Sequence, residues 1–231
     1  YSLLLPNIYE SKALLAPAMP EDSLANKLGG YSSLAGIAGI SLPADSGSKS
    51  TEAIERIKSY DFFVNQFIPH IEFKNLVAAK EWNQINNSIS YDKNIFDNAT
   101  SRWTRKINYP RLAKPSYQEA YEIYKKILKI SEDKKTSFVS LSIEHRSPYI
   151  AEKRTKLIIL NINDHMRDID KALADSSIVF LTSTSINTNL AEIKKSISNL
   201  IEKQIQVLTL AEANKDYVFK LISSPIVPEK S

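Results

Sequence analysis

The sequence predicts an α+β fold in which a small mixed α/β base carries a long antiparallel helical hairpin. All five glycines of the 231-residue chain lie between Gly29 and Gly47. From Pro148 to Ser224 the chain contains no glycine and no further proline. Helix is the expected structure where such breakers are missing. Shorter segments near both ends alternate polar and apolar residues and predict strands.

The first part of the chain predicts a strand, a loop and a helix. Residues 8–16 alternate polar and apolar side chains and are closed by a proline, which is typical of a half-buried strand. A short helical turn is expected at residues 22–28. Small apolar residues surround the glycines of segment 29–47, so we expect a turned surface loop there. Residues 50–67 follow as a helix, with Ser50 or Thr51 as its cap and acids in its first turn.

The middle of the chain is less regular. Residues 73–114 show a weak pattern, and we expect one helix at 76–85 followed by irregular chain. Ser116 and Glu119 then form a capping box, and an apolar stripe at helical spacing covers residues 117–128. This combination predicts a well-defined helix.

The last third carries the hairpin. Residues 139–143 alternate apolar and polar side chains and predict a strand. Ser147-Pro148 supplies a cap and a first-turn proline for a helix that should reach about Ser183. Asn189 and Glu192 make a second capping box, so the chain should turn back there into a returning helix.

A final strand completes the predicted base. Residues 217–222 are aromatic and β-branched and are followed by two prolines. We therefore divide the chain into an α/β base of residues 1–147, completed by 217–231, and a helical hairpin arm of residues 148–216.

Composition excludes several classes of function. The net charge is only +4, carried by segments of mixed sign, which is too little for a nucleic-acid binder. There is no cysteine, which excludes disulfides, thiolate catalysis and zinc-thiolate sites. No apolar run approaches the roughly 20 residues needed to span a bilayer. The chain begins at Tyr1 inside an apolar run, as a fragment trimmed from a longer protein would.

Several motifs, in this order and spacing, resemble the Wzz family of bacterial polysaccharide chain-length determinants, or polysaccharide co-polymerases. The resemblance covers nearly the whole chain. The motifs are the opening Tyr9-Glu10-Ser11-Lys12-Ala13-Leu14-Leu15-Ala16-Pro17, the Gly29-Gly30 to Gly39 segment, His145-Arg146-Ser147-Pro148 leading into Ile162-Asn163, and the ending Pro225-Ile226-Val227-Pro228-Glu229.

The resemblance implies a non-enzymatic protein without catalytic residues, metal or cofactor. It implies a periplasmic domain on the bacterial inner membrane, held by two transmembrane helices outside this chain, with the α/β base near the membrane. It also implies a ring of identical subunits that sets how far a polysaccharide polymerase extends O-antigen or a related lipid-linked glycan.

One basic cluster is the candidate contact surface. Arg102, Arg105, Lys106, Arg111 and Lys114 follow one another without an intervening acid. Such a cluster could bind phosphate on a lipid carrier, an acidic glycan or an acidic patch on the next subunit. A solvated basic face is the simpler interpretation.

Aromatic residues crowd the same region and could stack on sugars, although packing in the core is the simpler interpretation. Glu81, Asp92 and Asp97 lie near the tryptophans and permit a glycan hydrolase as an alternative. A periplasmic adaptor or sensor with a helical docking arm is a second alternative. His70, His145 and His165 show no metal-ligand spacing. The aromatic residues are Trp82, Tyr91, Phe96, Trp103, Tyr109, Tyr117, Tyr121 and Tyr124.

Overall fold

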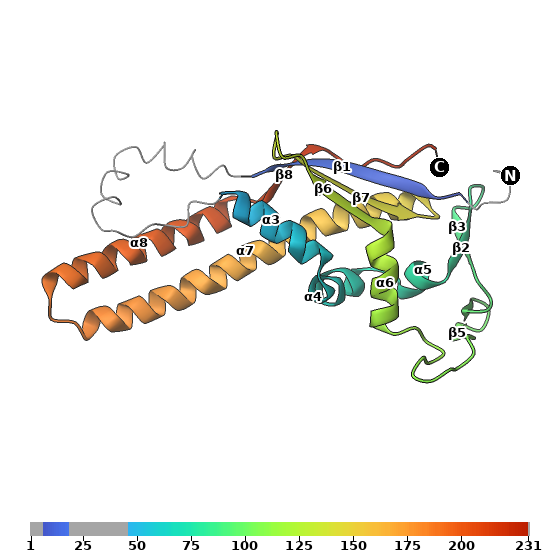
Figure 1. Ribbon diagram of the computed structural model, residues 1–231, viewed down its shortest axis with the longest axis horizontal. Helices are drawn as coiled ribbons and strands as arrows, with labels where there is room; N and C mark the ends of the chain where they lie inside the picture. Colours follow the sequence, from blue (N-terminus) through green and yellow to red (C-terminus); the bar gives the residue numbers. More distant parts are fainter. Residues whose placement is uncertain (1–6, 19–45, 231) are drawn as a thin grey trace.

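The computed structural model describes residues 7–18 and 46–230 and confirms the α+β class. The molecule is elongated: one end holds a sheet with short helices and hairpins, and two long helices extend from it (Figure 1). The expected turn at 22–28 and all of segment 29–47 except its last two residues lie outside the described residues.

An antiparallel four-stranded sheet forms the base, in the order β6-β7-β1-β8. The strands are β1 (Tyr9–Pro17), β6 (Leu128–Glu132), β7 (Val139–His145) and β8 (Phe219–Ser223). The first and last strands are neighbours, with Leu15 opposite Leu221. In β1 the side chains of Tyr9, Ala13 and Leu15 are buried, as the alternating pattern predicts.

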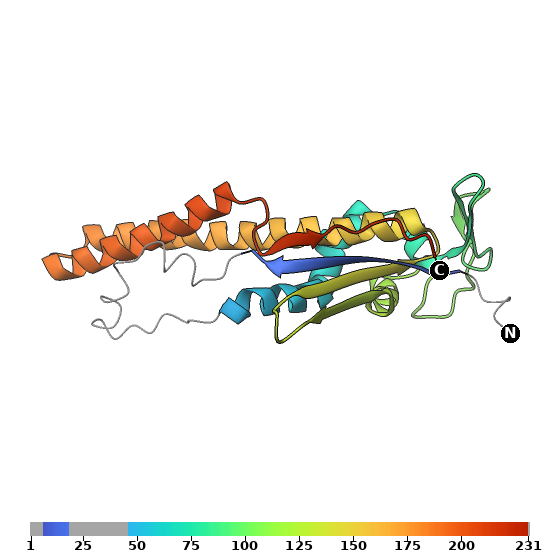
Figure 2. The same cartoon turned by 90° about the horizontal axis from the view of Figure 1, so that it is seen from above.

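The long helix α7 (Pro148–Ile186) serves both the base and the arm. Its first half lies along the sheet, where Ile158, Ile162 and Met166 are fully buried in the core (Figure 2). Its second half extends beyond the sheet and pairs with α8 (Ala191–Ala213), which runs back toward β8 (Figure 1). At 1.5 Å per residue, α7 is about 60 Å long. The predicted hairpin is present.

Short helices complete the core beside α7. They include α3 (Ser46–Lys58), α4 (Tyr60–Phe62), a π-helical turn at Phe63–Phe67 and α6 (Tyr117–Ile127). The predicted helix at 50–67 is therefore interrupted at Ser59, whose hydroxyl caps α4. The predicted capping box of α6 is confirmed in both of its hydrogen bonds.

Two local predictions are wrong. Residues 76–85 do not form one helix: α5 (Phe73–Val77) ends early, and β2 (Ala79–Asn83) pairs with β3 (Ser88–Tyr91) as a hairpin. The turn is rich in asparagine, and Asn87 adopts a positive φ of 49°, which asparagine tolerates. Small strands β4 (Phe96–Asp97) and β5 (Arg102–Trp103) follow.

The second capping box is also not formed. Leu190 is the N-cap of α8 and makes no side-chain cap bond. The neighbouring polar side chains turn back to α7 instead: Asn187 donates to the carbonyl of Ser183, and Thr188 donates to that of Thr184. The turn between the helices is thus held by the C-terminal end of α7.

Candidate functional site

Four residues of the predicted basic cluster lie on one projecting loop, residues 104–114, between β5 and α6, and the fifth, Arg102, lies in β5 just before it. The loop stands out at the end of the molecule opposite the tip of the hairpin arm (Figure 1). At its tip, a turn is closed by two backbone hydrogen bonds between Asn108 and Arg111, of 3.1 and 2.9 Å. The Tyr109-Pro110 peptide bond in this turn is cis.

Arg105 fastens this loop to α6. Its Nη1 and Nη2 donate to the two carboxylate oxygens of Glu119 at 2.7 and 3.1 Å, and its Nε and Nη2 also donate to the carbonyl of Leu112. The same carboxylate accepts the backbone N–H of Ser116 in the capping box. The hydrogen bonds from Arg105 and Ser116 lower the pKa of Glu119 to about 2. Arg105 therefore has an internal role.

The other basic residues of the cluster differ in their contacts and exposure. The Nε of Arg111 lies 3.7 Å from Glu119, although 71% of the Arg111 side chain is exposed. The Lys114 ammonium lies over the ring of Phe73, 5.7 Å from its centre. Arg102 and Lys106 are exposed. The structure thus brings Arg105 and Arg111 together at Glu119, and leaves Lys106 and Lys114 elsewhere on the loop and Arg102 on β5.

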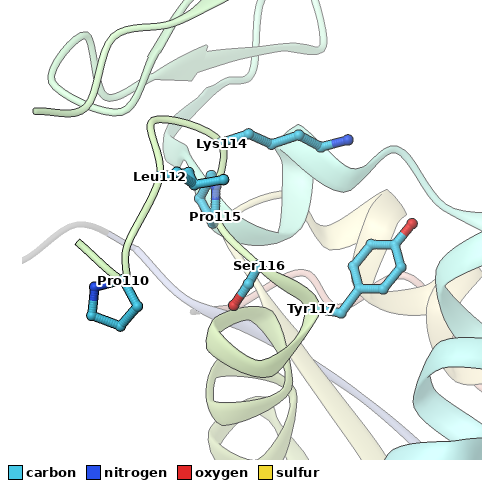
Figure 3. Close-up of a pocket in the computed structure, with 6 residues that line it drawn as sticks. All are labelled: Pro110, Leu112, Lys114, Pro115, Ser116 and Tyr117. Carbon is cyan, nitrogen blue, oxygen red and sulfur yellow. The ribbon is translucent and has the colours of Figure 1, made fainter. Parts of the chain in front are cut away.

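An open pocket of about 340 Å³ lies where the loop meets α6 (Figure 3). Its wall is mostly apolar, and the side chain of Lys114 supplies a cation. Such a surface can accept a C–H-rich ligand that carries an anionic group. The lining residues are Pro110, Leu112, Lys114, Pro115, Ser116 and Tyr117.

Most of the predicted aromatic platform is used for internal packing. Tyr124 is fully buried and donates to the carbonyl of Ile57, and Tyr121 donates to that of Lys58. Phe96 and Trp103 pack edge to face at 4.9 Å, and Trp82 packs against Tyr9 and Tyr149. Tyr109 is different, because 81% of it is exposed at the loop tip.

Two of the three acidic residues of the hydrolase alternative, Asp92 and Asp97, close turns. Asp92 accepts the N–H of Asn94, and Asp97 accepts the N–H of Ala99 and the hydroxyl of Thr100. The Thr100 hydrogen bond lowers the pKa of Asp97, whereas a general acid needs a raised pKa. Glu81 is exposed on β2.

The histidines lie apart from one another. His70 is exposed, and His165 lies 3.4 Å from the side-chain amide of Gln66. His145 is buried: its Nε2 donates to the carbonyl of Asn75, and its Nδ1 accepts the N–H of Ser147. Within residues 7–18 and 46–230, no group of three or more histidines, aspartates or glutamates is arranged to hold a metal ion.

The arm presents a second surface. Several of its large apolar side chains are exposed along both helices. On α7 they include Leu173 and Phe180, seven residues apart and therefore on one side of the helix, at 64% and 67% exposure. The others are Val179, Ile186, Leu190, Ile193, Leu200 and Ile205.

Two features were not predicted from the sequence. The first is the Arg105–Glu119 ion pair, because Glu119 was already assigned as the acid of the capping box. A run of basic residues close to such an acid was the signal that could have indicated the pair. The second is the burial of Arg154 beside His145 and Phe67, where the guanidinium lies 6.0 Å from the Phe67 ring centre. Nothing in the local sequence pattern distinguishes this arginine from an exposed one.

In the part of the chain that the structure describes, no helix combines the length and the apolar character needed to span a membrane. No protein-family model matches the sequence, and no curated protein matches it. Among solved structures, the chain is similar to a fragment of WzzB, a polysaccharide co-polymerase from Salmonella Typhimurium. The identity is 13%, the match covers 97% of this chain and 98% of that one, and the TM-score is 0.38.

Proposed function

We propose that this chain is the periplasmic domain of a non-enzymatic regulator of O-antigen or related polysaccharide chain length, anchored in the bacterial inner membrane. In this proposal it acts as an oligomeric scaffold for the polymerase. The proposal is supported by the family resemblance of the motifs quoted above. The base and arm remain our proposed functional division: the base lies near the membrane and the arm extends from it.

The observation that carries the scaffold role is the arm itself. Its two helices bury only a narrow seam between them, with Ile197 and Ala211 buried on α8, and leave long apolar side chains in solvent. Exposed apolar groups of this number on a helical pair are suited to contacts with further helices. A second copy of the chain, repeated around a ring, would cover them.

The basic loop is the second proposed contact surface. Arg105 is committed to Glu119, so Arg102, Lys106, Arg111 and Lys114 are the cations that a partner would meet. Cations at the rim of an interface orient the partner, while apolar surface supplies most of the affinity.

A lipopolysaccharide ladder tests the function. Cells that lack the full-length protein should lose their modal glycan length, and expression of the full-length protein should restore it. Replacing Glu81, Asp92 or Asp97 singly by the matching amide should leave the ladder intact, because a scaffold has no catalytic acid to lose. An unchanged ladder in the knockout contradicts the proposal, and loss of polymer in a folded single variant supports the hydrolase alternative.

Self-association tests the scaffold directly. We expect the isolated chain to associate weakly in sedimentation as its concentration rises, because membrane anchoring is needed to raise the local concentration. Leu173→Ser with Phe180→Ser should reduce this association. Ile222→Ser on β8, which is 50% exposed, is the matched control away from the arm. A strictly monomeric chain at high concentration contradicts the scaffold, and ligand-dependent stabilisation of such a monomer would favour a sensor.

A further inference from the structure

The tip of the 104–114 loop exposes three large apolar side chains within six residues. Ile107 is 51% exposed, Tyr109 81% and Leu112 55%. A single exposed apolar residue is ordinary on a protein surface, but a cluster on a projecting loop is an interaction signal. None of the three contributes to the buried core of the described residues.

Cations flank these apolar side chains, and acids are missing. The sequence contains no aspartate or glutamate between Asp97 and Glu119, and Lys106 and Arg111 directly adjoin the apolar tip. The Glu119 carboxylate beside the loop is already hydrogen-bonded to Arg105. The exposed part of the loop therefore carries only positive charge, which is complementary to a phosphate-bearing surface.

The loop is held in shape before any partner arrives. Arg105 joins it to Glu119, the Asn108–Arg111 turn closes its tip, and Thr104 donates from its backbone to Ile95 and from its hydroxyl to Lys93. A preorganised loop loses little conformational entropy when it binds. The loop lies at the end of the molecule opposite the tip of the arm, beside β5 (Figure 1).

We propose that this loop docks onto an anionic phospholipid bilayer, with Ile107, Tyr109 and Leu112 inserted at the headgroup level and the surrounding cations on the lipid phosphates. Apolar and tyrosine side chains among lysine and arginine are the composition of interfacial membrane anchors. A soluble acidic glycan would satisfy the cations but would offer no hydrocarbon to the apolar tip. Membrane docking is a further property beyond chain-length regulation, because all the observations that support it belong to the loop.

Vesicle flotation with the 231-residue chain tests the proposal. The probes are vesicles of phosphatidylcholine alone and of phosphatidylcholine with phosphatidylglycerol. We expect binding to the anionic vesicles, weakened by salt, and much less binding to the neutral ones. Arg102→Glu with Lys106→Glu should weaken binding at least about tenfold. Lys134→Glu with Lys135→Glu, in the exposed turn between β6 and β7, makes the same change in net charge elsewhere.

The apolar contribution has its own variants. Ile107→Ser with Leu112→Ser should weaken binding without changing net charge, whereas Val179→Ser with Phe180→Ser on the arm should not. Tyr109→Trp places a probe at the tip, and its added fluorescence should shift to shorter wavelength on vesicles and be quenched by brominated lipid. Thermal melting of each variant confirms that it is folded.

Three results would overturn the proposal. The first is a folded wild-type chain that does not bind anionic vesicles. The second is equal loss of binding from the Lys134 and Lys135 variant, which means general charge attraction. The third is binding that depends on the cations but not on Ile107 and Leu112, and that transfers to a soluble acidic polysaccharide, which means a polyanion site. None of these results alters the outcome of the lipopolysaccharide ladder, so the two proposals fail separately.

Discussion

The side-chain amide of Asn163 on α7 completes the backbone hydrogen bonding of Phe219 on β8. Its Oδ1 accepts the N–H of Phe219 at 2.9 Å and that of Val218 at 2.8 Å, while its Nδ2 donates to the carbonyl of Phe219 at 3.0 Å. All three bonds are buried. A single side chain on the long helix thus fixes where the last strand begins.

Replacing Asn163 should therefore cost more than an ordinary polar substitution. Asn163→Ala leaves two backbone N–H groups and one carbonyl without this partner in a buried place, and we expect a loss of roughly 2–4 kcal/mol in the free energy of unfolding. Urea denaturation measures it. Asn199→Ala, at an exposed position of α8, is the control and should change stability little. A loss no larger than that of the control would mean that water replaces the amide.

His145 predicts a pH dependence. Burial, with the nearby Arg154 guanidinium, lowers its pKa from 6.5 to about 3. The unfolded chain therefore takes up this proton first as the pH falls. The folded state therefore has its full stability with respect to His145 above pH 6.5, and it loses stability progressively as the pH falls toward 3. The expected loss in the free energy of unfolding between pH 7 and pH 5 is about 2 kcal/mol.

Two measurements check the behaviour of His145. Its ring resonances in NMR should not titrate between pH 7 and pH 5. The unfolding free energy of His145→Gln should depend less on pH over that interval than that of the wild type, whatever its absolute value. A histidine that titrates near its ordinary pKa in the folded protein would contradict the buried neutral ring.

Arg154 should be replaceable by an apolar residue. It is only 2% exposed, its guanidinium nitrogens have no hydrogen-bond partner among the described residues, and burial lowers its pKa to about 9. Arg154→Met keeps the length of the side chain and removes a buried charge, so we expect a gain of about 1 kcal/mol or more in stability.

The matched variant is Arg154→Lys, which keeps a buried charge but loses the planar group over Phe67, and it should be less stable than the wild type. Thermal melting ranks the three proteins. If Arg154→Met melts below the wild type, the guanidinium has an acceptor outside the described residues or in solvent.

The seam of the arm gives a paired test on one helix. Ile197 is 5% exposed and Ile193 is 45% exposed, although they lie one turn apart on α8. Ile197→Asp should cost several kcal/mol by burying an unpaired charge, and should separate α8 from α7. Ile193→Asp should be nearly neutral. Circular dichroism would show the loss of helix, and equal effects of the two variants would contradict the observed packing.

The sequence predicted elements whose signals are local. The capping box of Ser116 and Glu119 and the breaker-free stretch after Pro148 both act within a few residues, and both helices are present. Strand β6 was missed because Leu128 and Ile130 continue an apolar stripe, and they become strand only by pairing with Ile143 and Leu141. Such pairing depends on residues far along the chain.

The candidate site also combines features that the sequence predicts with features that depend on the fold. The run of cations was visible in the sequence, and so was the aromatic character of its surroundings. That Arg105 turns inward to Glu119 while Tyr109 faces solvent depends on how the loop folds back on α6. Periodicity carries no information about a loop, because its side chains have no repeating direction.

The pairing of β1 with β8 also determines when the domain can finish folding. β1 begins the described chain, and its partner β8 begins only at Phe219. Until β8 has been synthesised, one side of β1 is an unpaired edge and Asn163 has no strand to hold. A chain that leaves the ribosome N-terminus first therefore cannot complete this sheet before β8 has emerged, and a protein truncated before Phe219 should aggregate through that edge.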